Sequence, residues 1–268
     1  HAALDEAQQQ QLQFAFIGTP CDVSALRNLA RIDPRVDQHC QFMLTMVCGG
    51  FMAPENLRTF LESQGIDFDQ ISGLRYRGNG CPGPTVITMA DGSKHEFSYL
   101  DFWGDDDSAW GLPPRCKICP DGIGDAADIA AADTWEGGAP TPENSKTDPG
   151  SNAAIVRSRR AADLMQRAID AGHLRRDADL TADDLSRFQP HQVVKKQAAW
   201  ARLSGMAGAG NLVPVTHGLR LRQLFDDNEK SFNTKEQAGA AERVRAGKFS
   251  EPVPRRRNTS TEKPIDET

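Results

Sequence analysis

The fold of this chain is decided by one stretch near its start, residues 14–31, which reads FAFIGTPCDVSALRNLAR. The first four residues form a continuous apolar run, which is typical of a strand buried in a parallel sheet. A Gly-Thr-Pro turn at 18–20 ends that run, and apolar residues then recur at helical spacing over 22–31. The stretch therefore predicts a strand, a turn and a helix, with Cys21 at the carboxyl end of the strand.

A second unit of the same kind follows. Residues 42–47 are another apolar run, which ends at Cys48, and Pro54 opens a predicted helix over 55–64. A strand–helix–strand–helix order favours parallel strands, so Cys21 and Cys48 should lie at the same edge of one sheet. Open α/β sheets bind ligands at the carboxyl edge of their strands, and the dipole at a helix N-terminus favours a thiolate there.

The remaining patterns predict an α/β fold. Its expected architecture is a small mixed or parallel sheet flanked by helices, with an antiparallel hairpin insertion. The insertion consists of predicted strands at 71–77, 85–89 and 95–100, with a hairpin turn at 90–93. Further strands are predicted at 127–135 and 153–156, and further helices at 101–110, 158–172, 181–188 and 195–206.

The two ends of the sequence differ from this domain. The chain begins with His1 and enters a buried-type strand after one predicted helix, so we interpret it as a fragment or a processed chain that lacks an N-terminal part. Beyond Asn228 the sequence turns polar. We therefore expect one domain over residues 1–228 and a disordered tail over 229–268.

Composition argues against several classes of protein. A net charge of -6 and a pI near 5.6 imply no domain-wide basic face, so a nucleic-acid partner is not expected. No stretch approaches the roughly 18 apolar residues of a membrane helix, and no signal peptide opens the chain. Six cysteines in such a chain favour a reducing, cytoplasmic compartment and metal or redox use over disulfides.

Four of these cysteines form the candidate site. Cys116 and Cys119 make a C-x-x-C pair, which is typical ligand spacing, and Cys21 and Cys48 follow the two predicted parallel strands. Four thiolates can hold either a zinc ion or an iron–sulfur cluster. Zinc sites usually show two local pairs and this sequence has one, but the residues alone leave both options open.

Several short motifs occur in a fixed order along residues 14 to 225. They are Gly18-Thr19-Pro20-Cys21, Ala25-Leu26-Arg27, Cys48, Tyr76-Arg77-Gly78, Pro82-Gly83, Cys116-x-x-Cys119, Ala127-Asp128-Ile129 and Asp133-x-Trp135. In this order they resemble the C-terminal domain of coenzyme F420 hydrogenase/dehydrogenase beta subunits. That family includes the deazaflavin-reducing hydrogenase beta chain and the ferredoxin-dependent divinyl chlorophyllide and hydroxymethyl chlorophyll reductases.

The resemblance implies an iron–sulfur flavoprotein oxidoreductase, or a subunit of one. Such a protein passes electrons between a [4Fe-4S] cluster, FAD and a deazaflavin, ferredoxin or another partner. The implied cluster ligands are Cys21, Cys48, Cys116 and Cys119. FAD is expected to need the family's N-terminal portion, which this sequence lacks. Cys81 stands where relatives often carry an aromatic residue and is interpreted as a buried or loop thiol, and Cys40 matches no known role.

Four further residues are candidate cofactor contacts, namely Thr19, Asp133, Trp135 and Lys195. Asp133, like Asp128, could orient a ligand at the strand end or cap a turn. Trp135 could stack on a flavin or pack in the core. Lys195, with His191 and Lys196, could meet the phosphates of a flavin or an acidic partner, or form a solvated basic face.

Other functions are weighed against this one. The chain could be an electron-relay or assembly module without its own substrate site, or a zinc-stapled interaction domain. Residues 105–107, three aspartates, could hold a cation or form an exposed acidic cap. The sequence has no Ser/His/Asp grouping, no P-loop and no complete Gly-x-Gly-x-x-Gly fingerprint, which argues against a nicotinamide-binding domain. No residue indicates the substrate or a catalytic role.

Overall fold

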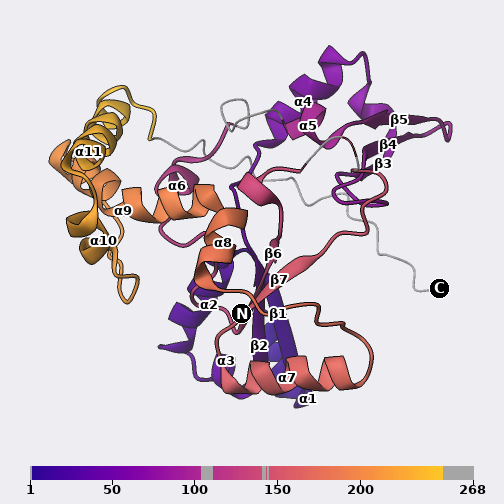
Figure 1. Cartoon of the computed structure of the whole chain (residues 1–268), viewed down its shortest axis with the longest axis horizontal. Coiled ribbons are helices and arrows are strands. Elements are labelled where there is room, and N and C mark those ends of the chain that lie inside the picture. Colours follow the sequence, from indigo (N-terminus) through magenta and orange to yellow (C-terminus); the bar gives the residue numbers. More distant parts are fainter. Residues whose placement is uncertain (1, 104–110, 141–142, 144, 250–268) are drawn as a thin grey trace.

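The first predicted unit forms as expected. The computed structural model describes residues 2–103, 111–140, 143 and 145–249, and it begins with α1 (Ala2–Gln10). Residues 14–31 then form β1 (Phe14–Gly18) and α2 (Pro20–Ala30) (Figure 1). The helix begins one residue before Cys21, so this cysteine lies within the first helical turn.

The main sheet has four strands in the order β1-β2-β6-β7. β2 (Cys40–Met46) follows the short α3 (Arg35–His39) and runs parallel to β1, which confirms the predicted parallel pair. β6 (Ile129–Asp133) continues the parallel order beside β2, and β7 (Asn152–Val156) closes the sheet in antiparallel fashion. The carboxyl ends of three parallel strands therefore meet at one edge of this sheet.

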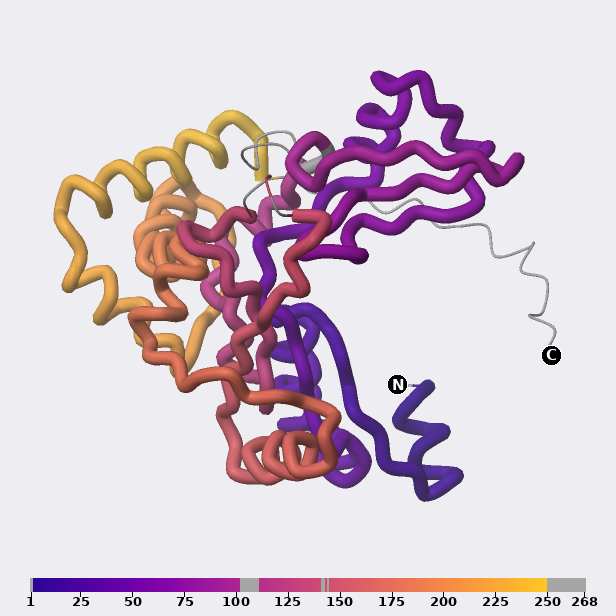
Figure 2. Tube along the Cα trace, turned by 45° about the vertical axis from the view of Figure 1, so that its right-hand side comes forward, coloured from indigo at the N-terminus to yellow at the C-terminus, as the bar shows by residue number. Residues whose placement is uncertain are grey.

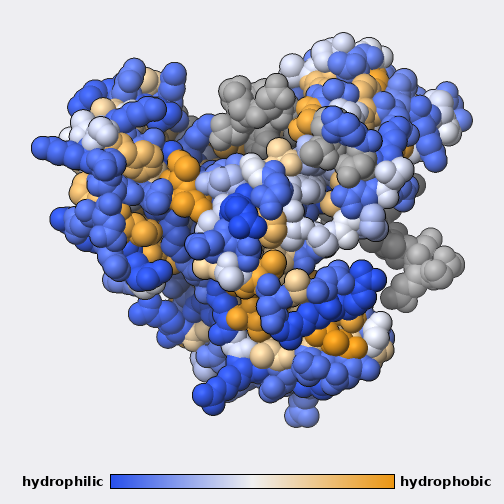
Figure 3. Space-filling model, viewed as in Figure 1, coloured by the Kyte–Doolittle hydropathy of each residue, from blue (hydrophilic) through white to orange (hydrophobic). Residues whose placement is uncertain are grey.

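One face of the main sheet carries its core. Val23 of α2, Val36 of α3 and Met43 of β2 are almost fully buried against one another. The opposite face stays partly open, because Ile17 of β1 is 70% exposed and Val156 of β7 is 37% exposed. The prediction that β1 is buried in the sheet is therefore wrong for the face that carries Ile17, and β1 is an edge strand. Apolar patches lie among hydrophilic surface in the lower part of the molecule (Figure 3).

The antiparallel insertion forms a separate lobe. β3 (Ile71–Arg75), β4 (Thr85–Met89) and β5 (Lys94–Phe97) pair as predicted, and α4 (Pro54–Ser63), followed by a 3-10 turn at Phe68–Gln70, packs on them. Its core contains Leu61 and Ile87, with Phe60 and Phe97 in edge-to-face contact at 5.3 Å between ring centres. The third strand is shorter than predicted, because α5 (Tyr99–Trp103) already begins at Tyr99. Figure 2 shows this lobe on the opposite side of the molecule from the C-terminal helices.

Short helical elements connect the lobe, the sheet and the C-terminal layer. α6 (Pro114–Lys117) precedes β6, and a 3-10 turn (Glu136–Gly138) follows it. α7 (Arg159–Asp170) follows β7. α8 (Ala182–Phe188) begins after its N-cap Thr181, whose side chain accepts a hydrogen bond from the Asp184 backbone. No helix in the described part of the chain is long and apolar enough to cross a membrane.

The C-terminal layer consists of α9 (Pro190–Gly208), α10 (Leu221–Asp227) and α11 (Lys230–Arg245). The predicted disordered tail over 229–268 is thus wrong for 230–245, which fold as α11 and pack along α9. Small residues let α11 pack closely on α9 although the sequence of α11 is polar. A Cβ on Gly205 would lie 2.1 Å from the Gln237 carbonyl oxygen, and Ala240 is 1% exposed. The rest of the predicted tail, 250–268, and the aspartates at 105–107 lie outside the described residues.

Candidate metal centre

Cys21 lies where β1 passes into α2, at the carboxyl edge of the main sheet. Thr19 caps this helix, because its backbone N–H and its hydroxyl both donate to the Asp22 carboxylate, at 2.9 and 2.6 Å. The Thr19 hydroxyl oxygen also lies 3.1 Å from the Cys21 sulfur. The thiol is exposed and lies in the first turn of an 11-residue helix, where the helix dipole favours negative charge.

Cys48 lies two residues after β2 at the same edge. Its backbone N–H donates to the Gly122 carbonyl at 2.9 Å, and the preceding Val47 N–H donates to the Ala131 carbonyl of β6 at 2.8 Å. These two hydrogen bonds hold the loop after β2 against the segment that leads from Cys119 into β6. The C-x-x-C pair therefore approaches the strand-end cysteines through backbone pairing that the sequence pattern did not show.

Cys116 and Cys119 occupy α6 and the turn after it. Pro113 and Pro114 precede them, and Pro114 begins the helix, which suits a residue that lacks a backbone donor. The Arg202 guanidinium of α9 donates to the Lys117 carbonyl at 2.9 Å and fixes this helix from the C-terminal layer. The two thiols are partly buried, and none of the six cysteines forms a disulfide.

The thiols are close enough to influence one another electrostatically. Burial raises the pKa of Cys48, and the Cys116 and Cys21 thiols raise it further. Burial also raises the pKa of Cys119, and Cys21 again adds to the effect. The Lys195 ammonium acts in the opposite direction on both. All four candidate ligands thus belong to one region, as the sequence predicted for Cys21 and Cys48.

Among the described residues, these groups do not make up a site for a single metal ion. No three His, Cys, Asp or Glu side chains in the described ranges meet the geometry that one metal ion requires. An iron–sulfur cluster binds each thiolate at a different corner, so its ligands stand further apart than those of one ion. Four soft thiol donors from three segments are the donor set that such a cluster takes.

A cavity opens beside Cys116, between α6, α9 and α11. Its volume is about 350 Å³. Ile118, Val194 and Phe249 supply apolar lining, and the basic lining residues are Lys117, His191, Lys195, Arg202 and Arg243. One candidate ligand therefore borders a basic hollow, and no acidic residue among those described lines it.

Asp133 and Trp135 lie at the carboxyl end of β6, where they meet the antiparallel lobe. Arg77 forms a two-pronged ion pair with the Asp133 carboxylate at 2.8 and 2.9 Å, and its guanidinium lies over the Trp135 ring at 4.9 Å. Tyr99 contacts the same ring edge-on, with 5.8 Å between ring centres. The Trp135 indole nitrogen is buried and has no hydrogen-bond partner within the described ranges. Sequence reasoning missed Arg77 and Tyr99 here, although Arg77 belongs to a motif that carried the family resemblance.

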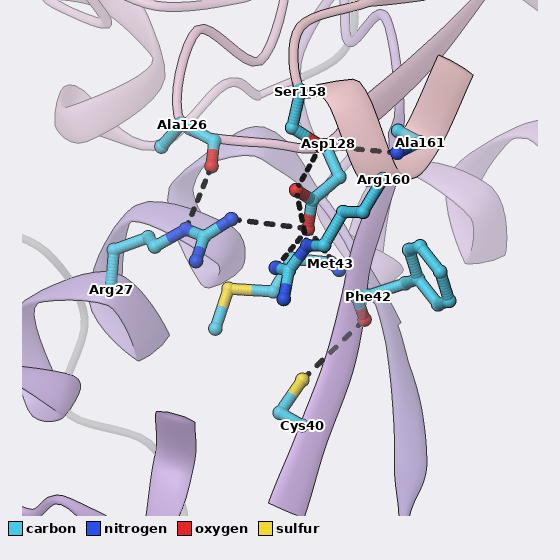
Figure 4. A network of polar contacts seen from close by, with 9 residues as sticks. All are labelled: Arg27, Cys40, Phe42, Met43, Ala126, Asp128, Ser158, Arg160 and Ala161. Atoms are coloured by element: carbon cyan, nitrogen blue, oxygen red, sulfur yellow. Dashed lines mark hydrogen bonds and ion pairs between the residues drawn. The ribbon is translucent and has the colours of Figure 1, made fainter. Parts of the chain in front are cut away.

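Asp128 lies at the other end of β6 and has a different environment (Figure 4). Its carboxylate accepts hydrogen bonds from Arg160 at 2.9 and 3.2 Å, from Ser158 at 2.7 Å and from the Met43 backbone at 2.9 Å. Arg27 forms a second ion pair with it at 3.1 Å. Burial alone would raise the pKa of Asp128, but these hydrogen bonds and charges outweigh burial and lower it. Asp128 therefore ties α2, β2 and α7 together and leaves no open face for a ligand.

The remaining candidates occupy separate places. The Lys195 ammonium donates to the Gly49 carbonyl next to Cys48, whereas Lys196 pairs with Asp125. Cys40 is 3% exposed at the amino end of β2, and its thiol points to the Phe42 carbonyl at 3.4 Å. Cys81 lies beside Gly150, whose added Cβ would stand 2.8 Å from the sulfur. Neither Cys40 nor Cys81 is among the thiols that act on Cys48 or Cys119.

The fold and the site define a class, an α/β domain with a cysteine-rich strand edge. Residues 12–179 match the model of a family described as the C terminus of the coenzyme F420 hydrogenase/dehydrogenase beta subunit. The chain belongs to this family, because the match covers more than half of it. The solved structure of the F420-reducing [NiFe] hydrogenase complex from Methanosarcina barkeri, studied by xenon derivatization, is similar at a TM-score of 0.52 and 15% identity. That similarity covers 81% of this chain and 70% of the other. No curated protein sequence matches the chain.

Proposed function

We propose that this chain holds a [4Fe-4S] cluster through Cys21, Cys48, Cys116 and Cys119, as part of an iron–sulfur flavoprotein oxidoreductase. The observation that carries the proposal is that cysteines from three separate segments come together at one sheet edge. Cys21 and Cys48 follow the parallel strands β1 and β2, and the Cys48 N–H pairs with Gly122, three residues after Cys119. Membership of the F420 hydrogenase/dehydrogenase beta-subunit family supports the redox class. The electron partner would be a deazaflavin, a ferredoxin or another subunit, in a reducing compartment such as the cytoplasm.

The cluster would supply one-electron transfer, and FAD would convert between one-electron and two-electron carriers. The chain's own residues would hold the ligands in place. The first turn of α2 directs its dipole at Cys21, and the pairing of the Cys48 N–H with Gly122 fixes the second ligand. The α6 turn positions the C-x-x-C pair, with Arg202 holding its backbone from α9.

FAD would contact the same edge of the sheet. Support comes from Trp135, whose buried indole N–H has no partner in the described part of the chain and could donate to a flavin acceptor. Asp133 is held nearby through its ion pair with Arg77, and both side chains of that pair stay partly exposed. Thr19 and Lys195 are the remaining proposed cofactor contacts, and both already touch the cysteine loops.

The test is iron, sulfide and flavin analysis of protein purified under nitrogen, with an absorbance spectrum. We expect about four irons and four sulfides per chain, as the composition of the cluster requires. Cys119→Ser should lower bound iron, and Cys81→Ser is the matched control that should leave it unchanged. Zinc without iron, or iron unaffected by Cys119→Ser, would overturn the ligand assignment. A cluster without flavin would instead make the chain an electron relay.

A further inference from the structure

Helix α9 reaches the cysteine site from outside the family-matched residues 12–179. Its first two turns carry Gln192 and Lys195, which both contact the loop after β2. The Gln192 side-chain amide donates to the Cys48 carbonyl at 2.9 Å, and the Lys195 ammonium donates to the carbonyl of the next residue, Gly49. These contacts span 144 and 146 residues of sequence, so only the folded chain creates them.

Gln192 is held tightly in this position. Gln192 is 5% exposed, and its side chain fills the space beside Gly122. A Cβ on Gly122 would lie 1.9 Å from the Gln192 side-chain oxygen and 3.1 Å from the Cys48 carbonyl oxygen. Because Gly122 also accepts the Cys48 N–H, both peptide groups of this cysteine are fixed. The ligand loop is thereby clamped between α9 and the segment after Cys119.

Lys195 brings a positive charge to the same place. It acts electrostatically on both Cys48 and Cys119, which come from different segments of the site. The neighbouring Lys196 differs, because it pairs with the Asp125 carboxylate, which also forms an ion pair with Arg157 at 3.6 Å. Of these two adjacent lysines, Lys195 therefore acts on the thiols, whereas Lys196 is paired with a carboxylate.

We infer that α9 sets the reduction potential of the centre, with Lys195 and Gln192 as positioning residues for the Cys48 ligand loop. The inference rests on the proposed cluster. Reduction adds one negative charge, and a nearby ammonium stabilises the reduced form more than the oxidised form. Gln192 keeps the loop, and hence that charge, at a fixed place. Residues outside the family-matched segment would thus adjust a centre whose ligands all lie within it.

The experiment is a potentiometric titration of the reconstituted full chain, followed by absorbance and electron paramagnetic resonance. Lys195→Met should shift the reduction equilibrium toward the oxidised form by about tenfold, which is about 59 mV for one electron. Lys196→Met removes an equal charge from the next residue and should shift it less. Lys195→Arg should restore most of the wild-type potential, because it keeps the charge.

A second variant tests the clamp. Gln192→Leu should release iron to a chelator about tenfold faster than the wild type, as expected when a group that orients a ligand is lost. Equal potentials for Lys195→Met and Lys196→Met, or unchanged iron release in Gln192→Leu, would overturn the inference while leaving the cluster in place. A wild-type chain that binds no iron and sulfide would overturn the proposed function itself.

Discussion

The two ends of strand β6 carry the same residue type in opposite roles. Asp128 precedes the strand with a side chain that is 3% exposed, and its partners all come from elements around the main sheet. Asp133 ends the strand with a side chain that is 25% exposed, and its partner, Arg77, comes from the antiparallel lobe. The amino edge of the sheet is thus closed by a satisfied charge network. The carboxyl edge instead holds cysteines, a half-open ion pair and an indole that lacks a hydrogen-bond partner among the described residues. A structural edge and the edge of the proposed site thus coexist on one sheet.

The largest expected effect concerns the closed edge. Asp128→Asn should lower the free energy of unfolding by about 3 kcal/mol at neutral pH, because Arg27 and Arg160 lose their counter-charge beside a buried site. Asp163→Asn, an exposed carboxylate on the same helix as Arg160, is the control and should change it by less than about 0.5 kcal/mol. Chemical denaturation of both variants measures the difference. Equal losses would show that Asp128 is no more structural than a surface residue.

The same carboxylate predicts a pH dependence. The pKa of Asp128 is lower in the folded chain than in the unfolded chain, so its stabilising contribution is complete above the unfolded value of about 4. That contribution is lost as the pH falls through the folded pKa. The stability difference between wild type and Asp128→Asn should therefore shrink when unfolding is measured at pH 3 instead of pH 7. A difference that stays constant would contradict the assignment of the charged form to the network.

The two cysteines that bracket β2 provide the next test. Burial raises the pKa of Cys40, so its thiol stays protonated at neutral pH and behaves as a small apolar group. Cys40→Ala should cost about 1 kcal/mol of stability and leave bound iron unchanged. Cys48→Ser should lose iron while changing stability less in the metal-free chain. Iron loss in Cys40→Ala would indicate a ligand at the amino edge of the sheet. It would contradict the assignment of the site to the carboxyl edge.

The smallest expected effect lies at the open edge. Arg77 is 41% exposed in its side chain, so its ion pair with Asp133 is partly screened by solvent. A double-mutant cycle of Arg77→Met and Asp133→Asn should give a coupling free energy of at most about 1 kcal/mol. A coupling free energy near the stability loss expected for Asp128→Asn, about 3 kcal/mol, would contradict the difference between the two ends of β6.

Much of the fold follows from local patterns. The strand–turn–helix units were predictable because glycine and proline interrupt apolar runs of the right length. The start of α8 is also a local feature, because Thr181 and Asp184 form its capping box within four residues. The exposure of β1 was not predictable, since edge position depends on which strands pair. Helix α11 was missed because its packing on α9 uses Gly205 and Ala240, small residues that do not register as an apolar stripe.

By itself, the sequence determined the α/β class, the parallel pair β1–β2 and the family, and it predicted four cysteines as a ligand set. Local spacing and order along the chain were enough for these. The tertiary structure alone decided that Asp128 is a structural residue, that Arg77 reaches Asp133 and that α9 clamps the loop of Cys48. Those assignments depend on contacts between segments as much as 146 residues apart. Local patterns in the sequence do not indicate which distant segments meet.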